Sequence, residues 1–180
     1  MARTKRDIDP ALKREQIEAA AGQLFLDQGY EATSMAAVAA AAGVAPNTLY
    51  WYFANKDDLL VAVLDRLVNK ALAELAGRQG QPLAQQFRWL MGELQQASRL
   101  VSTVHARLGQ SERIHAWHER FHAMLETLLV QQMTAAGMAP ARAAMMATVG
   151  TFVVEGLLSH PHSAQQLDRV TKWLWESARP

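Results

Sequence analysis

No cysteine occurs in this sequence of 180 residues, which excludes a disulfide-stabilised scaffold, a thiolate metal site and a cysteine nucleophile. The net charge is only +1 and argues neither for nor against a nucleic-acid partner. The longest apolar tract, residues 143–154, is too short to predict a membrane-spanning helix. No apolar run follows the basic N-terminus, so no secretory signal is predicted. We expect a soluble, cytoplasmic protein without a membrane partner.

The alternating pattern of a half-buried strand is also absent, and apolar residues instead recur every three or four positions. Half of the residues are hydrophobic, which is enough for a substantial core. The pattern predicts an all-α fold of about nine helices. Their expected ranges are 12–28, 35–42, 46–53, 56–75, 83–99, 100–108, 112–136, 140–158 and 163–177.

Residues with specific backbone preferences separate these expected helices. Ser34 and Asn55 are good N-caps, and Pro46 suits a first helical turn because its missing N–H is not needed there. Gly43 can adopt the left-handed conformation that ends a helix. The stretch 77–82, GRQGQP, is the first clear linker.

The second and third expected helices have the lengths and spacing of a helix-turn-helix, whose second helix reads the major groove of DNA. Leu49 and Phe53 lie one turn apart and should pack inward. The hydroxyls of Thr48, Tyr50 and Tyr52 can then face phosphates. Asn47 is the best candidate for a base edge, because a carboxamide can pair bidentately with adenine, and Lys56 supplies a cation. Trp51 is undecided between a DNA contact and internal packing.

The segment 29–64, GYEATSMAAVAAAAGVAPNTLYWYFANKDDLLVAVL, resembles the DNA-binding signature of TetR/AcrR-family bacterial transcriptional regulators, and the resemblance extends over about 12–65. It implies a homodimer that binds a near-palindromic DNA operator, with phosphate contacts at Thr33, Thr48, Tyr50 and Lys56. It also implies a helix-turn-helix domain at 1–55, joined by a long fourth helix to a ligand-binding and dimerisation domain at 56–180. The expected DNA-binding residues are Thr33, Ser34, Ala45, Pro46, Asn47, Thr48, Tyr50, Trp51, Tyr52 and Lys56.

Two departures from the family pattern concern charge. The second helix is nearly all alanine, and Pro46 stands where many members have lysine or arginine, so the third helix lacks a cation. The first fourteen residues carry a net charge of +3. We hypothesise that this arm supplies the missing attraction to phosphate, the alternative being an ordinary disordered terminus. Its charged residues are Arg3, Lys5, Arg6, Asp7, Asp9, Lys13 and Arg14.

The last two expected helices carry apolar stripes that suit a four-helix dimer interface. Gly156 would permit close helix approach there. The alternative is that the stripes face the core of their own subunit. The expected interface residues are Met145, Val149, Phe152, Val153, Gly156, Leu157, Leu167, Val170 and Leu174.

Methionine and aromatic residues between the fourth and eighth helices suit a flexible apolar pocket, and equally an ordinary core. The family resemblance favours a pocket, and the lack of a charged residue among its candidates predicts a small hydrophobic effector. The expected lining residues are Trp89, Met91, Leu94, Val104, His105, Trp117, Phe121, Met124 and Leu128.

A histidine cluster is the remaining candidate for chemistry. His115, His118 and His122 share a helix face with Glu119 and Glu126, and imidazole and carboxylate are zinc or nickel ligands. A fourth ligand would have to come from His105, His160 or His162. The alternative is a solvated polar face, and we expect no metal or cofactor.

Together with these features, the resemblance implies a ligand-responsive repressor that a small hydrophobic molecule releases from its operator. No nucleophile–base arrangement is evident, so we expect no enzyme. The alternatives are a helical metal-binding protein or enzyme that uses the histidine cluster, and a dimeric adaptor that has lost operator binding. Repression and activation are not distinguished by the sequence.

Overall fold

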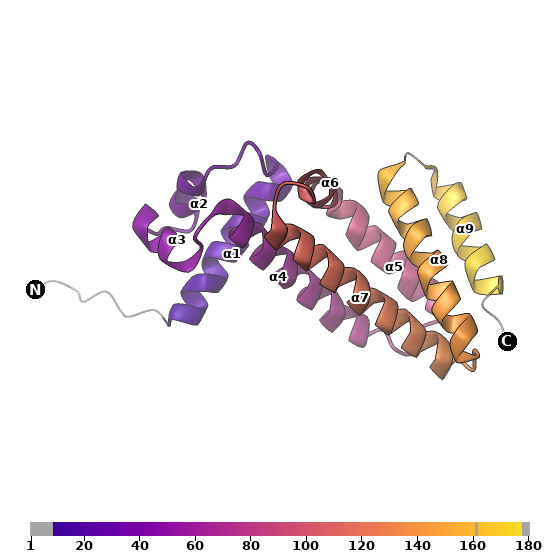
Figure 1. The fold of residues 1–180 in the computed structure, drawn as a ribbon. Helices are drawn as coiled ribbons and strands as arrows, with labels where there is room; N and C mark the ends of the chain where they lie inside the picture. Colours follow the sequence, from indigo (N-terminus) through magenta and orange to yellow (C-terminus); the bar gives the residue numbers. More distant parts are fainter. Residues whose placement is uncertain (1–8, 161, 178–180) are drawn as a thin grey trace, which may run out of the picture. The chain divides into compact units, whose positions relative to one another are not determined.

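The computed structural model describes residues 9–160 and 162–177, and every regular element in these ranges is an α-helix (Figure 1). This confirms the predicted all-helical fold. The helices are α1 (Pro10–Asp27), α2 (Met35–Ala41), α3 (Pro46–Tyr52), α4 (Lys56–Ala76), α5 (Leu83–Gln96), α6 (Ser98–Arg107), α7 (Glu112–Ala135), α8 (Pro140–Ser159) and α9 (Ala164–Ser177). The expected ends agree to within three residues, and the largest difference is at the end of α5.

The described residues form two compact units, which divide between Asn69 and Lys70, inside α4. We expected a functional division at residue 55, and that division stays a prediction. The first unit holds α1, α2, α3 and most of α4, and the second holds the last turns of α4 with α5 to α9.

The core of the first unit is built on one face of α1. Ile17, Ala21 and Phe25 are spaced by four residues and have no exposed surface. Phe25 also contacts Tyr30, with ring centroids 5.4 Å apart. Burying aliphatic and aromatic side chains of this size contributes about 1.5–3 kcal/mol each. These buried side chains therefore form a packed core beneath the short helices α2 and α3.

In the second unit, α7 packs along α8, α5 packs against α9, and α6 contacts α5, α7 and α8. Ala143 and Ala147, one turn apart on α8, have no exposed surface. Their small side chains allow the backbones of α8 and its neighbour to approach closely. Ile114 and Trp117 are buried on α7 and Leu100 on α6.

Helix α8 corrects one expectation. We predicted that residues 143–154 are too short a tract to span a membrane, but Pro140–Leu158 is long and apolar enough to do so. This observation rests on length and composition only, and one such helix is weak evidence for a membrane segment. Only 17% of this window is buried in a single chain. The large apolar side chains that α8 exposes are Met145 and Phe152.

Candidate functional site

Helices α2 and α3 are held in place by the local signals that the sequence contains. The Ser34 hydroxyl accepts a hydrogen bond from the Ala37 N–H at 3.1 Å, which confirms Ser34 as the N-cap of α2. Gly43 has φ of 64°, and the next residue, Val44, donates its N–H to the Ala39 carbonyl at 2.9 Å. Pro46 occupies the first turn of α3. The turn between the two helices therefore follows from a capping serine, a left-handed glycine and a proline.

The inner side of α3 is anchored as predicted. Leu49 has no exposed surface and Phe53 is 2% exposed. The Arg14 guanidinium carbon lies 4.6 Å from the centre of the Phe53 ring, on the side of α1. These contacts fix how α3 is rotated about its own axis, and therefore which of its residues face outward.

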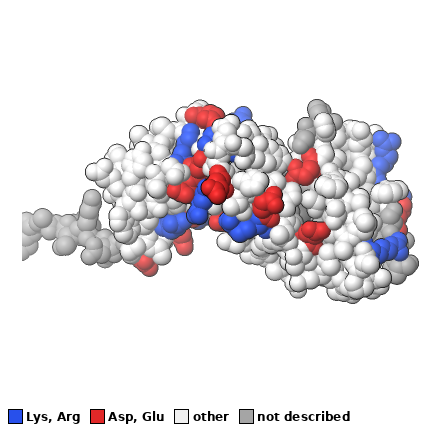
Figure 2. Space-filling model, in the orientation of Figure 1, with Lys and Arg blue, Asp and Glu red and all other residues white. Residues whose placement is uncertain are grey.

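The outer side of α3 exposes large aromatic surface. Tyr50 is 53% exposed and Trp51 is 75% exposed, and the Trp51 ring meets the Tyr52 ring edge-on at 4.8 Å. Thr48 and Tyr52 are half-buried. We call the outward residues of this segment the reading face, and they are Ala45, Pro46, Asn47, Thr48, Tyr50, Trp51 and Tyr52. None of them is charged, and the surface over α3 is correspondingly white in Figure 2.

Thr33 does not belong with these residues, and the prediction that it contacts phosphate is corrected. Its side chain is 1% exposed, and its hydroxyl donates to the Gly29 carbonyl at 2.8 Å, with the Leu24 carbonyl at 3.4 Å. The hydroxyl thus satisfies carbonyls at the end of α1. Ser34 remains exposed and can face a phosphate.

The Lys56 side chain binds backbone carbonyls within the first unit, a contact that we call the clamp, and it is also a candidate phosphate ligand. Its ammonium donates to the Tyr30 carbonyl at 2.9 Å and to the Thr33 carbonyl at 3.1 Å, and it lies 4.1 Å from the centre of the Tyr30 ring. The Tyr30 hydroxyl in turn donates to the Asp57 carboxylate. An ammonium has three N–H donors, so one at most is left for a phosphate.

We expect Lys56→Met to lower the free energy of unfolding of the first unit by about 2 kcal/mol, because two charge-assisted hydrogen bonds and a cation–π contact are lost. Chemical denaturation followed by circular dichroism measures the change. Lys70→Met is the matched control, since Lys70 is 70% exposed and pairs loosely with Glu74 at 3.8 Å. That change should cost no more than about 0.5 kcal/mol. Equal losses in the two variants would show that the clamp is not stabilising.

Charge in the first unit is unfavourable for DNA. Residues 9–69 contain four lysines and arginines against eight aspartates and glutamates. Arg14 is paired with Glu18 at 2.8 Å, and Lys56 binds carbonyls. Arg3, Lys5, Arg6 and Asp7 lie outside the described residues. Because residues 9–69 carry a net negative charge, attraction to phosphate depends more on the basic arm than the sequence pattern alone indicated.

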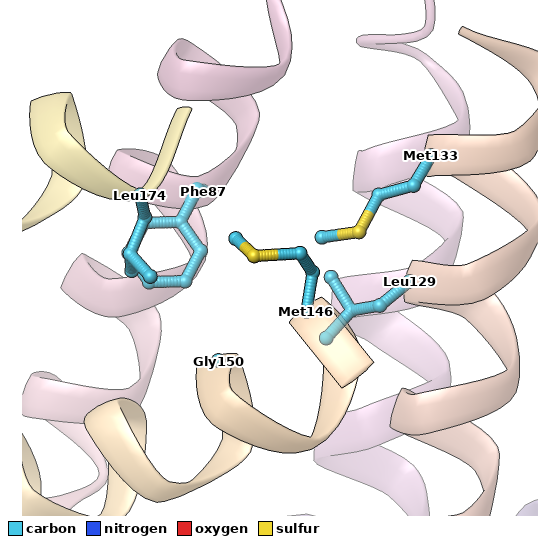
Figure 3. Close-up of a pocket in the computed structure, with 6 residues that line it drawn as sticks. All are labelled: Phe87, Leu129, Met133, Met146, Gly150 and Leu174. Carbon is cyan, nitrogen blue, oxygen red and sulfur yellow. The ribbon is translucent and has the colours of Figure 1, made fainter. Parts of the chain in front are cut away.

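A small pocket in the second unit lies apart from the residues that we predicted to bind an effector. Its volume is about 20 Å³, which is room for about one water molecule. In Figure 3, Met146 extends between the pair Phe87 and Leu174 on one side and the pair Leu129 and Met133 on the other. Gly150 completes the lining. A pocket for a drug-sized ligand usually has about 300–1,000 Å³, so this one is not preformed for such a molecule.

None of the nine lining residues that we predicted borders this small pocket, and their role in effector binding stays a prediction. Met91, Val104 and Trp117 are buried core residues, and Trp117 stacks on Phe121 with ring centroids 5.1 Å apart. Trp89 lies beneath the Arg78 guanidinium at 4.7 Å. The rest of the predicted set is half-buried: Leu94, His105, Phe121, Met124 and Leu128.

The histidine face that we predicted on α7 is also rearranged. His115 and Glu119 are exposed, and Glu126 accepts a hydrogen bond from the Thr148 hydroxyl at 2.9 Å. His118 and His122 instead meet two residues from other helices, His105 of α6 and Glu155 of α8. Glu155 lies between His105 and His122, a position that periodicity along one helix cannot reveal.

The predicted dimer residues divide into exposed, buried and half-buried ones. Met145 and Phe152, seven residues apart on α8, are 65% and 70% exposed, and the surface over α8 is mostly uncharged in Figure 2. Leu174 is corrected, because it is 6% exposed and lines the small pocket of its own chain. Trp173, next to it, is 60% exposed. The remaining predicted residues are half-buried: Val149, Val153, Gly156, Leu157, Leu167 and Val170.

Comparison with known sequences gives matches that cover only part of the chain. Residues 17–63 match the family model of the tetR family of bacterial regulatory proteins. The HTH-type transcriptional repressor ComR of Escherichia coli (strain K12) is 46% identical over 68 residues, which are 38% of this chain and 30% of that protein. The HTH-type transcriptional activator FasR of Mycolicibacterium smegmatis is 39% identical over 61 residues, 34% of this chain and 28% of that protein. The similarity therefore spans less than a third of the length of these curated relatives.

Solved structures resemble the chain over most of its length. A transcriptional regulator from Rhodococcus sp. Rha1 superposes with a TM-score of 0.67 at 22% identity, covering 92% of this chain and 91% of that chain. GusR of Salmonella enterica has a TM-score of 0.68 at 20% identity, covering 97% of this chain and 95% of that chain. At these identities the likeness shows the fold alone.

Proposed function

Residues 17–63 match the model of the tetR family of bacterial regulatory proteins, and we propose that the chain belongs to this family and is a cytoplasmic, ligand-responsive transcriptional repressor. In this proposal a homodimer binds a near-palindromic operator, and a small effector bound by the second unit releases it. The observation that carries the proposal is the reading face, which is uncharged and exposes Tyr50 and Trp51 above the buried anchors Leu49 and Phe53. Buried anchors with exposed aromatic and polar neighbours are what a recognition helix requires.

Each residue of the reading face has a distinct part in this proposal. Asn47 pairs with a base edge, while the hydroxyls of Thr48, Tyr50 and Tyr52 donate to phosphates. Trp51 is the most exposed aromatic residue of the segment and packs against sugar or a thymine methyl group. Ser34 adds a hydroxyl from the start of α2.

One uninterrupted helix belongs both to the proposed DNA-binding unit and to the proposed effector-binding unit. α4 begins at Lys56, the clamp beneath the helix-turn-helix, and continues into the second unit as far as Ala76. An effector releases DNA only to the extent that it binds the DNA-incompetent state more tightly than the competent one.

Selection of genomic DNA fragments by the purified full-length protein tests the proposal. We expect one enriched motif with two half-sites in inverted orientation, about 34 Å apart or a multiple of that spacing. Recovery of fragments without a common motif would contradict operator binding and favour an adaptor.

We expect the basic arm to contribute most of the salt dependence of that binding. Replacing Arg3, Lys5 and Arg6 by glutamine should reduce the slope of log K against log salt by about one unit for each cation that contacts a phosphate. The same number of changes at Lys70, Arg88 and Lys172, which are 60–75% exposed in the second unit, is the control and should leave the slope unchanged. Equal slopes in both triple variants would reject a role for the arm.

A further inference from the structure

Three helices of the second unit bring metal-binding side chains together. His105 lies near the end of α6, His118 and His122 lie one turn apart on α7, and Glu155 lies on α8. The candidate ligand atoms of His105, His118 and Glu155 are all within 4.8 Å of one another. Ligands from three helices can surround an ion, which ligands from a single helix cannot.

The carboxylate of Glu155 is held between two imidazoles. His105 Nε2 is 3.2 Å from Glu155 Oε2, and His122 Nε2 is 3.1 Å from Glu155 Oε1. A tetrahedral zinc site with bonds of about 2.1 Å separates its ligand atoms by about 3.4 Å. The His105–Glu155 pair is therefore already at the spacing of two zinc ligands, with His122 supporting the other carboxylate oxygen.

His118 supplies an independent indication. Its Nε2 is buried and has no hydrogen-bond partner among the described residues, which is unusual for a buried polar atom. An imidazole nitrogen without a hydrogen-bond partner can offer its lone pair to a metal ion.

We propose that His105, His118 and Glu155 bind a divalent transition-metal ion, with His122 as a positioning residue for Glu155, and that this ion is the effector. Two imidazoles and one carboxylate suit zinc, nickel or iron and do not suit magnesium or calcium, which prefer oxygen. The side chains are 16–31% exposed, so an ion can enter and a water molecule can complete its coordination.

The effector role rests on the proposed function and adds the chemical class of the ligand. The described pocket between Phe87 and Met133 admits about one water, whereas a metal site needs no large preformed cavity. A bound ion would tie α6, α7 and α8 to one another, and any state that holds these helices apart would bind it less tightly. Such differential affinity is what allows an ion to shift a conformational equilibrium.

Calorimetric titration of the chelator-treated full-length protein with Zn²⁺ tests the site. We expect one ion per chain, no binding of Mg²⁺, and affinity at least about 100-fold lower in Glu155→Gln and His118→Ala. Glu155→Gln keeps nearly the same volume, and thermal unfolding checks that each variant is folded. His115→Ala, an exposed histidine on the same helix, should bind Zn²⁺ like the wild type. Wild-type affinity in Glu155→Gln and His118→Ala, or no binding by the wild type, would overturn the site.

Co²⁺ distinguishes a ligand from a positioning residue. We expect His122→Ala to weaken Co²⁺ binding by about 10–100-fold while the visible absorption of the bound ion keeps its wild-type shape. His118→Ala should change that absorption, because a coordinating nitrogen is lost. A changed spectrum in His122→Ala would make His122 a ligand and overturn its positioning role.

Operator titrations with and without Zn²⁺ test the effector role. We expect operator affinity to fall by about 10-fold or more when Zn²⁺ is bound, and the operator must then lower Zn²⁺ affinity by the same factor. Glu155→Gln should not respond to Zn²⁺. Zn²⁺ binding with unchanged operator affinity would overturn the effector role. Absence of operator binding in both conditions would instead overturn the proposed function, while the calorimetric test of the site stands.

Discussion

Leu49→Ala will lower the free energy of unfolding of the first unit by about 3–4 kcal/mol and will weaken operator binding with it. Leu49 has no exposed surface, so its truncation removes buried methyl groups and leaves a cavity beneath α3. The loss of operator affinity is large because Leu49 and Phe53 determine how the reading face is rotated. Denaturant titration of the purified variant measures the change, and operator titration measures the functional loss.

Leu12→Ala is the matched control for this prediction. The substitution is the same, but Leu12 is 48% exposed on α1, and surface changes usually alter stability by no more than about 0.5 kcal/mol. If Leu49→Ala unfolds at the same denaturant concentration as Leu12→Ala, α3 is not anchored as described, and the assignment of its outer residues fails with it.

Phe152→Glu will dissociate the proposed dimer. The Phe152 side chain is 70% exposed in a single chain, on an apolar helix whose surface is otherwise unexplained. A two-fold interface places both copies of a residue in the same contact, so the substitution introduces two charges into it. Burial of unpaired charges should raise the dimer dissociation constant by at least about 100-fold, equivalent to about 3 kcal/mol. Sedimentation at several protein concentrations measures that constant.

Ala123→Glu is the charge-matched control, because Ala123 is exposed on α7 and belongs to no proposed contact. It should sediment like the wild type. Operator affinity should fall in Phe152→Glu and stay unchanged in Ala123→Glu, since a monomer reads only one half-site. If the Phe152→Glu variant remained dimeric, the dimer interface would not include this face of α8.

The parts of the fold that the sequence predicted are those encoded by local chemistry. Ser34, Gly43 and Pro46 each have a backbone preference that ends or begins a helix, and the helix-turn-helix follows them closely. The break between α5 and α6 at Ala97 has no glycine or proline to announce it, so the end of α5 was placed three residues late. Asp9 and Pro10 were an overlooked start signal, since the Asp9 carboxylate accepts the Ala11 N–H at 2.9 Å.

The parts that could not be predicted depend on contacts between distant segments. Thr33 and Ser34 are adjacent hydroxyl residues, and only the end of α1 decides that the first is buried. Leu128 was predicted to line a pocket and Leu129 does so, because neighbouring residues on a helix point in different directions. Glu155 is 37 residues from His118 along the chain, so no periodicity could have placed the two together.

The most direct test of the central claim is the affinity of the full-length protein for its selected operator, compared with a scrambled duplex of the same composition at physiological salt. A reading face that contacts base edges predicts a ratio of at least about 1,000. A ratio near one would mean that the reading face detects no sequence, and the description of this chain as an operator-binding regulator would be contradicted.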